Sequence, residues 1–433
     1  MPFPQILFPV ILFAVTYALM IVLQNQRHWV ALGSAVIFII SSLAGWMPPL
    51  KITDAIDWNV LLMLFGTMGT VSFFIASKMP DKMAKGLLKL APNAKWAVIL
   101  ISLFAGLISA FMDNVATVLM IAPIGLAVAK ELKISPVSML ICIAVSSNLQ
   151  GAATLVGDTT SIMLGGHTGM DFMDFFVFKG RASICWAVEL GALATIPVIA
   201  TIFRKEKQKI TVQSDVKVED HIPSVLLLLN IVLLIGASFI PDKPEITNGL
   251  ICAGIFLITA VYSLVKNRSF AGIRKAFCEI DYQTLLLLAS LFVVIAGITN
   301  AGVLQIVADA LVKAGNNNLF LVYTLIVWGS VLCSAFVDNI PYVATMLPVI
   351  EGIAVSMGCS ETTKFVLFFG LLVGATLGGN ITPIGASANI AAIGILRKEG
   401  YEVKNKDFLR IGVPFTLVAV TVGYLYCWLI WAH

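Results

Sequence analysis

The sequence predicts an all-α polytopic membrane protein with about ten transmembrane helices and two re-entrant hairpins, arranged as two inverted-topology repeats. Three observations lead to this fold class. First, 59% of the 433 residues are apolar and only 12% are charged, whereas soluble domains carry roughly a quarter charged residues. Second, several short motifs recur in the same order in the two halves of the chain. Third, lysine and arginine are distributed unevenly among the polar segments.

The composition also excludes several functional classes. The net charge of +4 is small and the basic residues lie in loops, so nucleic-acid binding is not expected. None of the seven cysteines forms a C-x-x-C pair, and the four histidines lack metal-ligand spacing. The apolar run 5–24 has no basic leader or small-residue cleavage site, which predicts a retained helix. We expect a multi-pass protein of a bacterial-type plasma membrane, with no cofactor other than a coupling ion.

Spanning helices are predicted where about 20 consecutive apolar residues occur. Two further intervals, 96–164 and 317–393, are apolar but interrupted by Asp, Asn, Gly, Thr and Pro. Those two intervals are where we expect the chemistry. The predicted spanning helices cover 5–24, 29–47, 58–77, 182–203, 223–240, 246–265, 282–299 and 411–431.

Three pairs of motifs indicate an internal repeat. I-D-W-N-V-L-L-M-L at 56–64 matches I-D-Y-Q-T-L-L-L-L at 280–288, an offset of 224. S-A-F-M-D-N and S-A-F-V-D-N, beginning at Ser109 and Ser334, follow at an offset of 225. Glycine-rich segments at 151–162 and 379–390 correspond at 228. Because the order is kept while the offset changes slowly, the chain contains two homologous halves.

Positive charge predicts how the halves are oriented. Every strongly basic segment can lie on the cytoplasmic side only if the two repeats have opposite topology and each acidic segment enters and leaves on one side. Both termini then lie outside. Inverted repeats with interrupted helices are typical of secondary transporters. The segments assigned to the cytoplasmic side are Arg27, 78–95, 130–133, the linker 204–221, 266–275 and 397–410.

These assignments define the predicted domains. The first repeat comprises residues 1–203, with a hairpin at 96–130 and a broken helix at 136–164. A cytoplasmic linker at 204–221 follows. The second, inverted repeat comprises residues 222–433, and its hairpin and broken helix are predicted at 317–355 and 361–393.

Acidic residues at the predicted hairpin tips are the first candidates for a functional site. Asp113-Asn114 and Asp338-Asn339 lie within otherwise apolar segments. A charged group at membrane depth is costly and is kept mainly where it faces a cavity or a partner. Irregular backbone at that depth must also be buried in protein or line a water-filled cavity. The alternative is that each aspartate only shapes its turn.

The glycine-rich segments supply the second set of candidates. Glycines can expose helix carbonyls to a cation, and the half-helix that follows can receive an anion. Asp158 is a third intramembrane acid that the second half lacks, although it could instead close a polar helix kink. Glu189 could relay protons, but pairing is preferred. Asp57 and Asp281 are expected to cap their helices.

The motifs S-A-F-M-D-N-V-A-T-V-L at 109–119 and G-A-T-L-G-G-N-I-T-P-I-G-A-S-A-N at 374–389 resemble the ion transporter superfamily. The resemblance is to the branch of the arsenite permease ArsB, the antiporter NhaD and the melanosomal P protein. V-G-D-T-T-S-I-M-L at 156–164 is closer to NhaD. More distantly, the tips are similar to those of sodium-coupled dicarboxylate carriers.

This resemblance implies a scaffold and a transport domain that slides as a unit, an elevator mechanism, usually within a homodimer. An energising partner subunit is also an expectation. Ion and substrate sites would lie between each tip and the following broken helix, with Na⁺, if bound, at Asn114, Asp158 and Asn339. The full set of implied binding residues is Asp113, Asn114, Thr154, Gly157, Asp158, Thr159, Asp338, Asn339, Asn380, Thr382, Gly385, Ser387 and Asn389.

The acids favour an ion-coupled secondary transporter rather than an enzyme. Carboxylates that share a low-dielectric cavity do not all stay ionised, because burial and mutual repulsion raise their pKa values, and this suits proton exchange or neutralisation by Na⁺. We expect H⁺ or Na⁺ coupling and a small inorganic substrate, either an arsenite-like oxyacid or Na⁺ itself. A Na⁺-coupled di- or tricarboxylate symporter of the citrate type is the alternative, although repulsion disfavours it. An intramembrane aspartyl protease is remote, because Asp158 lacks the first glycine of G-x-G-D.

Overall fold

The computed structural model describes residues 3–209 and 216–433, and nearly all of its secondary structure is helical. Within these residues, the one departure from an all-α fold is a two-stranded hairpin of β1 (Val177–Phe178) and β2 (Arg181–Ala182). Eight described helices are long and apolar enough to cross a membrane, or up to ten if two bent pairs count as one span each. This range agrees with the predicted number of about ten.

The first half begins with two helices that meet at a sharp bend of 114° around Leu23. Its later helices are interrupted at 110–113 and at 152–158, where the sequence predicts a hairpin tip and a helix break. The helices of this half are α1 (Phe3–Val22), α2 (Arg27–Leu43), α3 (Ile52–Ala55), α4 (Trp58–Ala76), α5 (Met79–Leu88), α6 (Ala94–Ser109), α7 (Asn114–Leu132), α8 (Pro136–Gly151), α9 (Thr159–Thr168) and α10 (Ile184–Ile202), with short 3₁₀ turns η1 (Gln24–Gln26) and η2 (Met173–Phe175).

The second half repeats this succession helix for helix over the described residues. Its interruptions lie at 335–338 and 379–386, again at the predicted tip and break. The helices are α11 (Ile222–Ala237), α12 (Thr247–Asn267), α13 (Ala271–Glu279), α14 (Tyr282–Asn300), α15 (Val303–Ala314), α16 (Leu319–Ser334), α17 (Asn339–Ser356), α18 (Lys364–Gly378), α19 (Ser387–Lys398) and α20 (Asn405–Trp431), with η3 (Gly379–Ile381) after α18.

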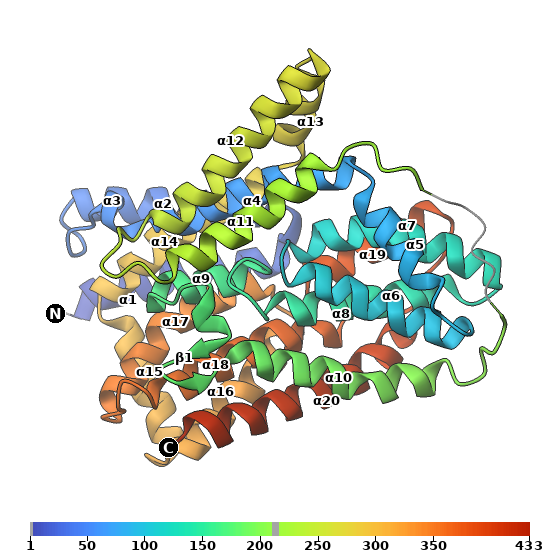
Figure 1. The fold of residues 1–433 in the computed structure, drawn as a ribbon. Coiled ribbons are helices and arrows are strands. Elements are labelled where there is room, and N and C mark those ends of the chain that lie inside the picture. The colour runs from blue at the N-terminus through green and yellow to red at the C-terminus, as the bar shows by residue number, and fades with distance from the viewer. Residues whose placement is uncertain (1–2, 210–215) are drawn as a thin grey trace.

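The two hairpins enter the molecule from opposite ends. In Figure 1, α6 and α7 extend from the right, whereas α16 and α17 lie to the left, so that the two tips approach one another near the middle. The broken helices follow the same reversal, with α8 on the right and α18 on the left. The start of α1 and the end of α20 lie at the same end of the molecule (Figure 1). This arrangement is the inverted topology that the charge pattern predicts.

Contacts between the halves are symmetric, because where two helices pack together, their counterparts in the other half also pack together. Helix α4 packs against α12, and its counterpart α14 packs against α2. Helix α6 packs along α8 just as α16 packs along α18, and the two long helices α10 and α20 lie side by side. The halves are therefore interlocked around one core rather than forming two separate domains.

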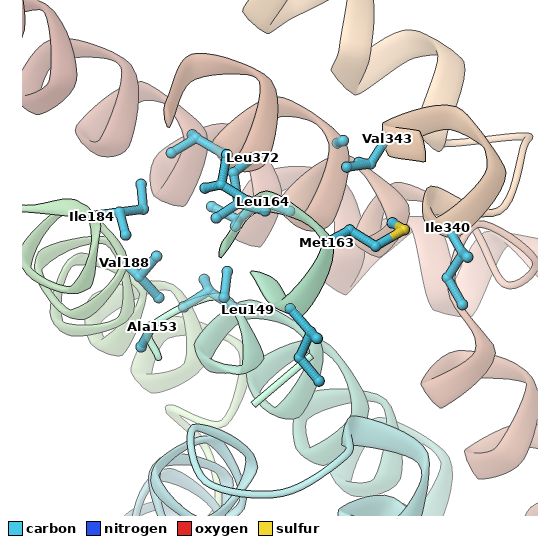
Figure 2. Packing of buried hydrophobic residues seen from close by; sticks show 14 of the residues in the cluster. Leu149, Ala153, Met163, Leu164, Ile184, Val188, Ile340, Val343 and Leu372 are labelled. Atoms are coloured by element: carbon cyan, nitrogen blue, oxygen red, sulfur yellow. The ribbon is translucent and has the colours of Figure 1, made fainter. Parts of the chain in front are cut away.

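The short helix α9 shows how closely the halves are joined. Met163 and Leu164 on α9 are 2% and 1% exposed. Figure 2 shows them beside Val343 of α17 and Leu372 of α18, with Ile184 of α10 nearby. Fully burying an apolar side chain of this size contributes roughly 1.5–3 kcal/mol relative to leaving it in water. This packing fixes the start of α9, which carries Asp158, relative to the second hairpin.

Candidate functional site

Each hairpin tip is an aspartate that caps the second helix of its hairpin. The Asp113 Oδ2 atom accepts a hydrogen bond from the Ala116 amide at 3.0 Å, and Asp338 Oδ1 accepts one from the Ile340 amide at 3.1 Å. Carboxylates are favoured at this position because the first amides of a helix lack intrahelical partners and the helix N-terminus is electropositive. The tips of both halves thus have the same local structure.

The two helix breaks differ in one side chain. Asp158 caps α9, accepting hydrogen bonds from the Thr159 amide at 2.9 Å and from Thr160 Oγ1 at 2.5 Å. At the corresponding position before α19, the cap is Ala386, whose side chain makes no capping hydrogen bond. The N-termini of α7, α9, α17 and α19 all line one pocket, and of these four helices only the first three begin at a carboxylate.

Each tip is held against its own helix break by a threonine. Thr154 Oγ1 donates to the carbonyl of Ala110, and Thr382 Oγ1 donates to the carbonyl of Ala335. These two bonds are equivalent under the repeat, and each satisfies a carbonyl that the end of a hairpin helix leaves without a backbone partner.

Glycine is required where the tips and breaks approach most closely. A Cβ atom on Gly157 would lie 2.7 Å from the carbonyl oxygen of Ser109, and one on Gly385 would lie 2.8 Å from that of Ser334. Real Cβ contacts of this length are essentially never observed. The glycines therefore allow backbone carbonyls to lie close together at each junction.

A small pocket of about 30 Å³ lies where these elements converge. That volume suits a dehydrated cation or one or two water molecules, since a buried water needs roughly 10–15 Å³. Both tips and both broken helices contribute to its wall. The lining residues are Met68, Asp113, Asn114, Val115, Asp158, Thr159, Asp281, Thr284, Asn339, Ile340 and Ser387.

A buried amide network connects the pocket to the opposite half. Asn114 Nδ2 donates to Asn148 Oδ1 at 2.9 Å and, at 3.4 Å, to Asp158 Oδ1. Asn148 Nδ2 in turn donates to the Thr376 carbonyl at 2.7 Å and to Asn380 Oδ1 at 3.0 Å. Asn148 is completely buried. Such networks are stabilising only when each member is satisfied, so this one fixes the position of the first tip against the second half.

A larger cavity of about 380 Å³ opens beside the second tip. We call it the vestibule. It shares Asp281, Thr284 and Ser387 with the small pocket. Its wall includes Arg27, whose Nη1 forms an ion pair with Asp338 Oδ2. The other residues lining the vestibule are Tyr17, Met20, Ile21, Gln24, Asn25, His28, Gln283, Phe336, Val337, Pro341, Ile384 and Ile390.

The predicted site residues divide into three groups. Six line the small pocket: Asp113, Asn114, Asp158, Thr159, Asn339 and Ser387. Asp338 and Ser387 line the vestibule. The remaining residues build the walls behind the pocket, through the contacts given above and through hydrogen bonds from Asn389 Nδ2 to the carbonyls of Gly379 and Thr382; these are Thr154, Gly157, Asn380, Thr382, Gly385 and Asn389.

The residues expected to bind Na⁺ are thus near one another. Asn114, Asp158 and Asn339 all line the small pocket and offer the oxygen ligands that hard cations prefer. Among the described residues, no group of three or more His, Cys, Asp or Glu side chains could hold a metal ion. Any Na⁺ site here would combine one carboxylate with amide and backbone oxygens.

The structure gives Arg27 a contact that the charge pattern does not indicate. Arg27 is predicted with the cytoplasmic basic loops, but its guanidinium lies against the second hairpin tip, which enters from the other end. The positive-inside rule counts charges in loops and does not reveal that a basic side chain begins helix α2 and bonds to a buried acid.

Three acids outside the predicted binding set form the caps or pairs that the sequence predicts, and one of the three also lines both cavities. Asp57 caps α4 by accepting from the Val60 amide at 3.0 Å, and Glu189 accepts from Gln150 Nε2 at 3.0 Å. Asp281 caps α14 as predicted, yet it also lines both the pocket and the vestibule. Asp281 occupies the same place in its repeat motif as Asp57, so the sequence did not indicate that it lines the two cavities.

Comparison with known proteins identifies relatives along the whole chain. Residues 17–374 match a family model, CitMHS, described as a citrate transporter. An uncharacterized transporter of Mycobacterium tuberculosis is 30% identical over 433 residues, covering 97% of each chain. The human P protein is 26% identical over 514 residues, covering 99% of this chain and 60% of the P protein.

Two solved structures have the same fold. The YdaH transporter of Alcanivorax borkumensis aligns with a TM-score of 0.58 at 16% identity, covering 86% of this chain and 84% of that one. MtrF of Neisseria gonorrhoeae aligns with a TM-score of 0.51 at 15% identity, covering 86% and 80%. The match to the family model spans most of the chain and agrees with the multi-pass helical fold. The chain is a secondary transporter that belongs to the CitMHS citrate transporter family, within the ArsB/NhaD-like ion transporter superfamily.

Proposed function

We propose that this chain is an H⁺- or Na⁺-coupled secondary active transporter of a small inorganic ion or oxyacid. The observation that supports the proposal most strongly is the small pocket between the two tips, because three acids line it: Asp158, which is buried, Asp113, which is half-buried, and Asp281, which is exposed. The three carboxylates repel one another when ionised, and Asp113 and Asp158 also lose hydration. Binding a proton or Na⁺ relieves both penalties, so the occupancy of the pocket depends on the coupling ion.

The inverted arrangement supports alternating access. Each half-helix ends near the pocket, so a modest shift of the hairpins and broken helices relative to α4, α12 and α14 would expose the pocket to one side or the other. We assign the moving part to α6–α9 and α16–α19, and the scaffold to α4 and α11–α14. An elevator-type movement of this kind, within a homodimer, is part of the proposal.

A citrate-type carboxylate is the second candidate substrate, and Arg27 specifically favours it. A guanidinium that faces a cavity of about 380 Å³ can bind a carboxylate with two parallel hydrogen bonds. The vestibule has room for an organic acid, whereas the small pocket does not. The family description as a citrate transporter points the same way.

Flux measurements with the purified chain in proteoliposomes test the proposal. Uptake of arsenite, of ²²Na⁺ and of citrate is followed after imposing a pH gradient, a Na⁺ gradient or neither. We expect uptake of one of these substrates to rise at least tenfold with one gradient, and to lose that response in Asp158→Asn. Uptake that ignores both gradients would refute coupling.

A matched control uses Lys130→Gln. Lys130 forms an exposed ion pair with Glu399 far from the pocket, at 2.7 Å. This variant tests whether a change of one charge on the surface alters flux, and it is expected to retain the wild-type response to both gradients.

A further inference from the structure

Arg27 and Asp338 form an ion pair between two parts of the molecule. Arg27 begins α2, and Asp338 is the tip of the α16–α17 hairpin. Their side chains are 23% and 12% exposed. The exposed remainder opens into the vestibule, since both residues line it. The pair is therefore accessible to a solute from the cavity without unfolding of either helix.

Asp338 keeps other partners if the arginine leaves. Ser387 Oγ donates to Asp338 Oδ2 at 3.2 Å, and the Ile340 amide donates to Oδ1 at 3.1 Å. Arg27, in contrast, has Asp338 as its hydrogen-bond partner within residues 3–209 and 216–433, through Nη1 alone. A guanidinium has five N–H donors. The remaining donors of Arg27 are thus left for a ligand in the vestibule.

The position of Arg27 is not explained by helix stability. A cation at a helix N-terminus is unfavourable because the first turn is electropositive. Here the cation is the first residue of α2. Other charged or titratable groups facing the pair are Tyr17 of α1, His28 of α2 and Asp281 at the start of α14, which line the same vestibule, and Asp113 and Asp158 across the shared wall. Arg27 is the one Arg or Lys among the described residues that line the vestibule and the small pocket.

We propose that Arg27 is the residue that recognises an anionic oxygen of the substrate, and that Asp338 occupies it in the empty carrier. The inference rests on the proposed transport function and adds a specificity-determining residue to it. An incoming carboxylate or oxyanion exchanges with Asp338 on the guanidinium. Asp338 then remains bonded to Ser387 and Ile340, and its unpaired charge favours uptake of the coupling H⁺ or Na⁺. Anion binding and cation binding would thereby be linked at the second tip.

An uncharged substrate would not need this exchange. Arsenous acid is neutral at neutral pH, whereas citrate, succinate and arsenate carry negative charge. If Arg27 recognises the substrate, its substitution should weaken the binding of anions and leave the binding of neutral arsenous acid unchanged. A bidentate site also distinguishes arginine from lysine, because an ammonium group cannot form the planar fork.

The test measures binding of citrate, succinate, arsenate and arsenous acid to the purified chain by calorimetry. We expect at least one anion to bind, with affinity reduced roughly 10- to 100-fold in Arg27→Gln, the usual loss for a hydrogen bond to a charged group. Arg27→Lys should recover part of the loss. Binding of arsenous acid, if measurable, should be unchanged in Arg27→Gln. Thermal unfolding of both variants identifies any that fail to fold, and Arg27→Lys then replaces Arg27→Gln as the decisive variant.

A double-mutant cycle shows whether the substrate anion replaces Asp338 on Arg27 or whether the ion pair is purely structural. Asp338→Asn removes the internal competitor, so it should raise anion affinity several-fold in the wild-type background and have no such effect in Arg27→Gln. The proposal is overturned if Arg27→Gln binds the anion as tightly as wild type, or if Asp338→Asn acts equally in both backgrounds. Failure of every anion to bind would also overturn it, while ²²Na⁺ or proton flux would still decide the proposed transport function.

Discussion

The two hairpin tips have the same backbone structure but different surroundings. Asp113 and Asp338 both cap the second helix of their hairpin and lie next to an asparagine. Asp113 lies near a second acid, Asp158, and within the described part of the chain it has no ion-pair partner. Asp338 is paired with Arg27 instead. The repeat thus supplies one geometry twice, while a few side chains make one side suited to a cation and the other suited to an anion.

The largest expected effect on stability comes from substituting the glycines that both halves use to join a tip to its helix break. Gly157→Ala and Gly385→Ala each place a Cβ within 3 Å of backbone carbonyls. We expect each to destabilise the fold by about 3 kcal/mol or more, near the upper end of overpacking costs, because backbone cannot move aside as a side chain can. Thermal unfolding in detergent should show similar losses in both halves.

The control for this comparison is Gly33→Ala. Gly33 lies within α2, and a Cβ added there meets no atom within 4 Å. It should be neutral or slightly stabilising, since alanine favours a helix by about 1 kcal/mol over glycine. An equal loss at Gly33 would show that the junction glycines are not special.

The second-largest effect is expected for the aspartates, whose substitution should abolish coupled transport without unfolding the protein. Asp113→Asn, Asp158→Asn and Asp338→Asn keep the shape of the cap and most of its hydrogen bonding. We expect coupled flux to fall at least 100-fold in the first two, because an amide does not take up a proton at neutral pH and lacks the negative charge that balances a bound Na⁺. Asp338→Asn should lose coupling yet bind the anion several-fold more tightly, which sharpens the difference between the tips. Proteoliposome flux and calorimetry together check this.

If Asp113→Asn and Asp158→Asn both retain wild-type coupled flux while unfolding at the wild-type temperature, the carboxylates are only helix caps. Identical behaviour of all three variants in both assays would instead remove the proposed difference between the tips.

The link between the halves is expected to be weaker. Asn148→Ala removes the donor to Asn380 Oδ1 and the acceptor of Asn114 Nδ2, both buried. Leaving buried polar atoms unpaired costs about 1–3 kcal/mol. Denaturant unfolding should show that loss. Asn300→Ala, which removes an exposed hydrogen bond to the Pro49 carbonyl at 3.2 Å, is the matched control and should change stability by less than about 0.5 kcal/mol.

The smallest effect is expected at the surface. Lys130→Gln removes the ion pair with Glu399 between the ends of α7 and α19, where the two side chains are 48% and 42% exposed. Exposed pairs contribute about 0–1 kcal/mol. A change in unfolding temperature comparable to that of Asn148→Ala would mean that these helix ends hold the halves together as strongly as the buried network does.

Much of this architecture could be predicted from the sequence, because the relevant signals are local. Asp113 and Asp338 are conspicuous as charges within apolar segments, and their spacing repeats. The basic loops then required the halves to be inverted, and Figure 1 shows the hairpins entering from opposite ends. Thr159 and Ser387, separated by the repeat offset of 228, both line the pocket.

The partners of these residues could not be predicted in the same way. Asn148 lies within a helix that is buried on all sides, where an amide could have bonded to its own backbone. Arg27 resembles any basic residue between two apolar runs, and only the 114° bend before α2 brings it to the second tip. Tertiary contacts across 34 and 311 residues decide these positions, and no local pattern records them.

The claim that the acids of the first half bind the coupling ion is tested most directly by a reversal-potential measurement in proteoliposomes. The membrane potential at which net substrate flux stops, under fixed substrate and ion gradients, gives the number of coupling ions carried per substrate. We predict that Asp158→Asn, in whatever flux remains, carries at least one ion fewer per substrate than the wild type, while Lys130→Gln carries the same number. An unchanged reversal potential in Asp158→Asn would contradict the account.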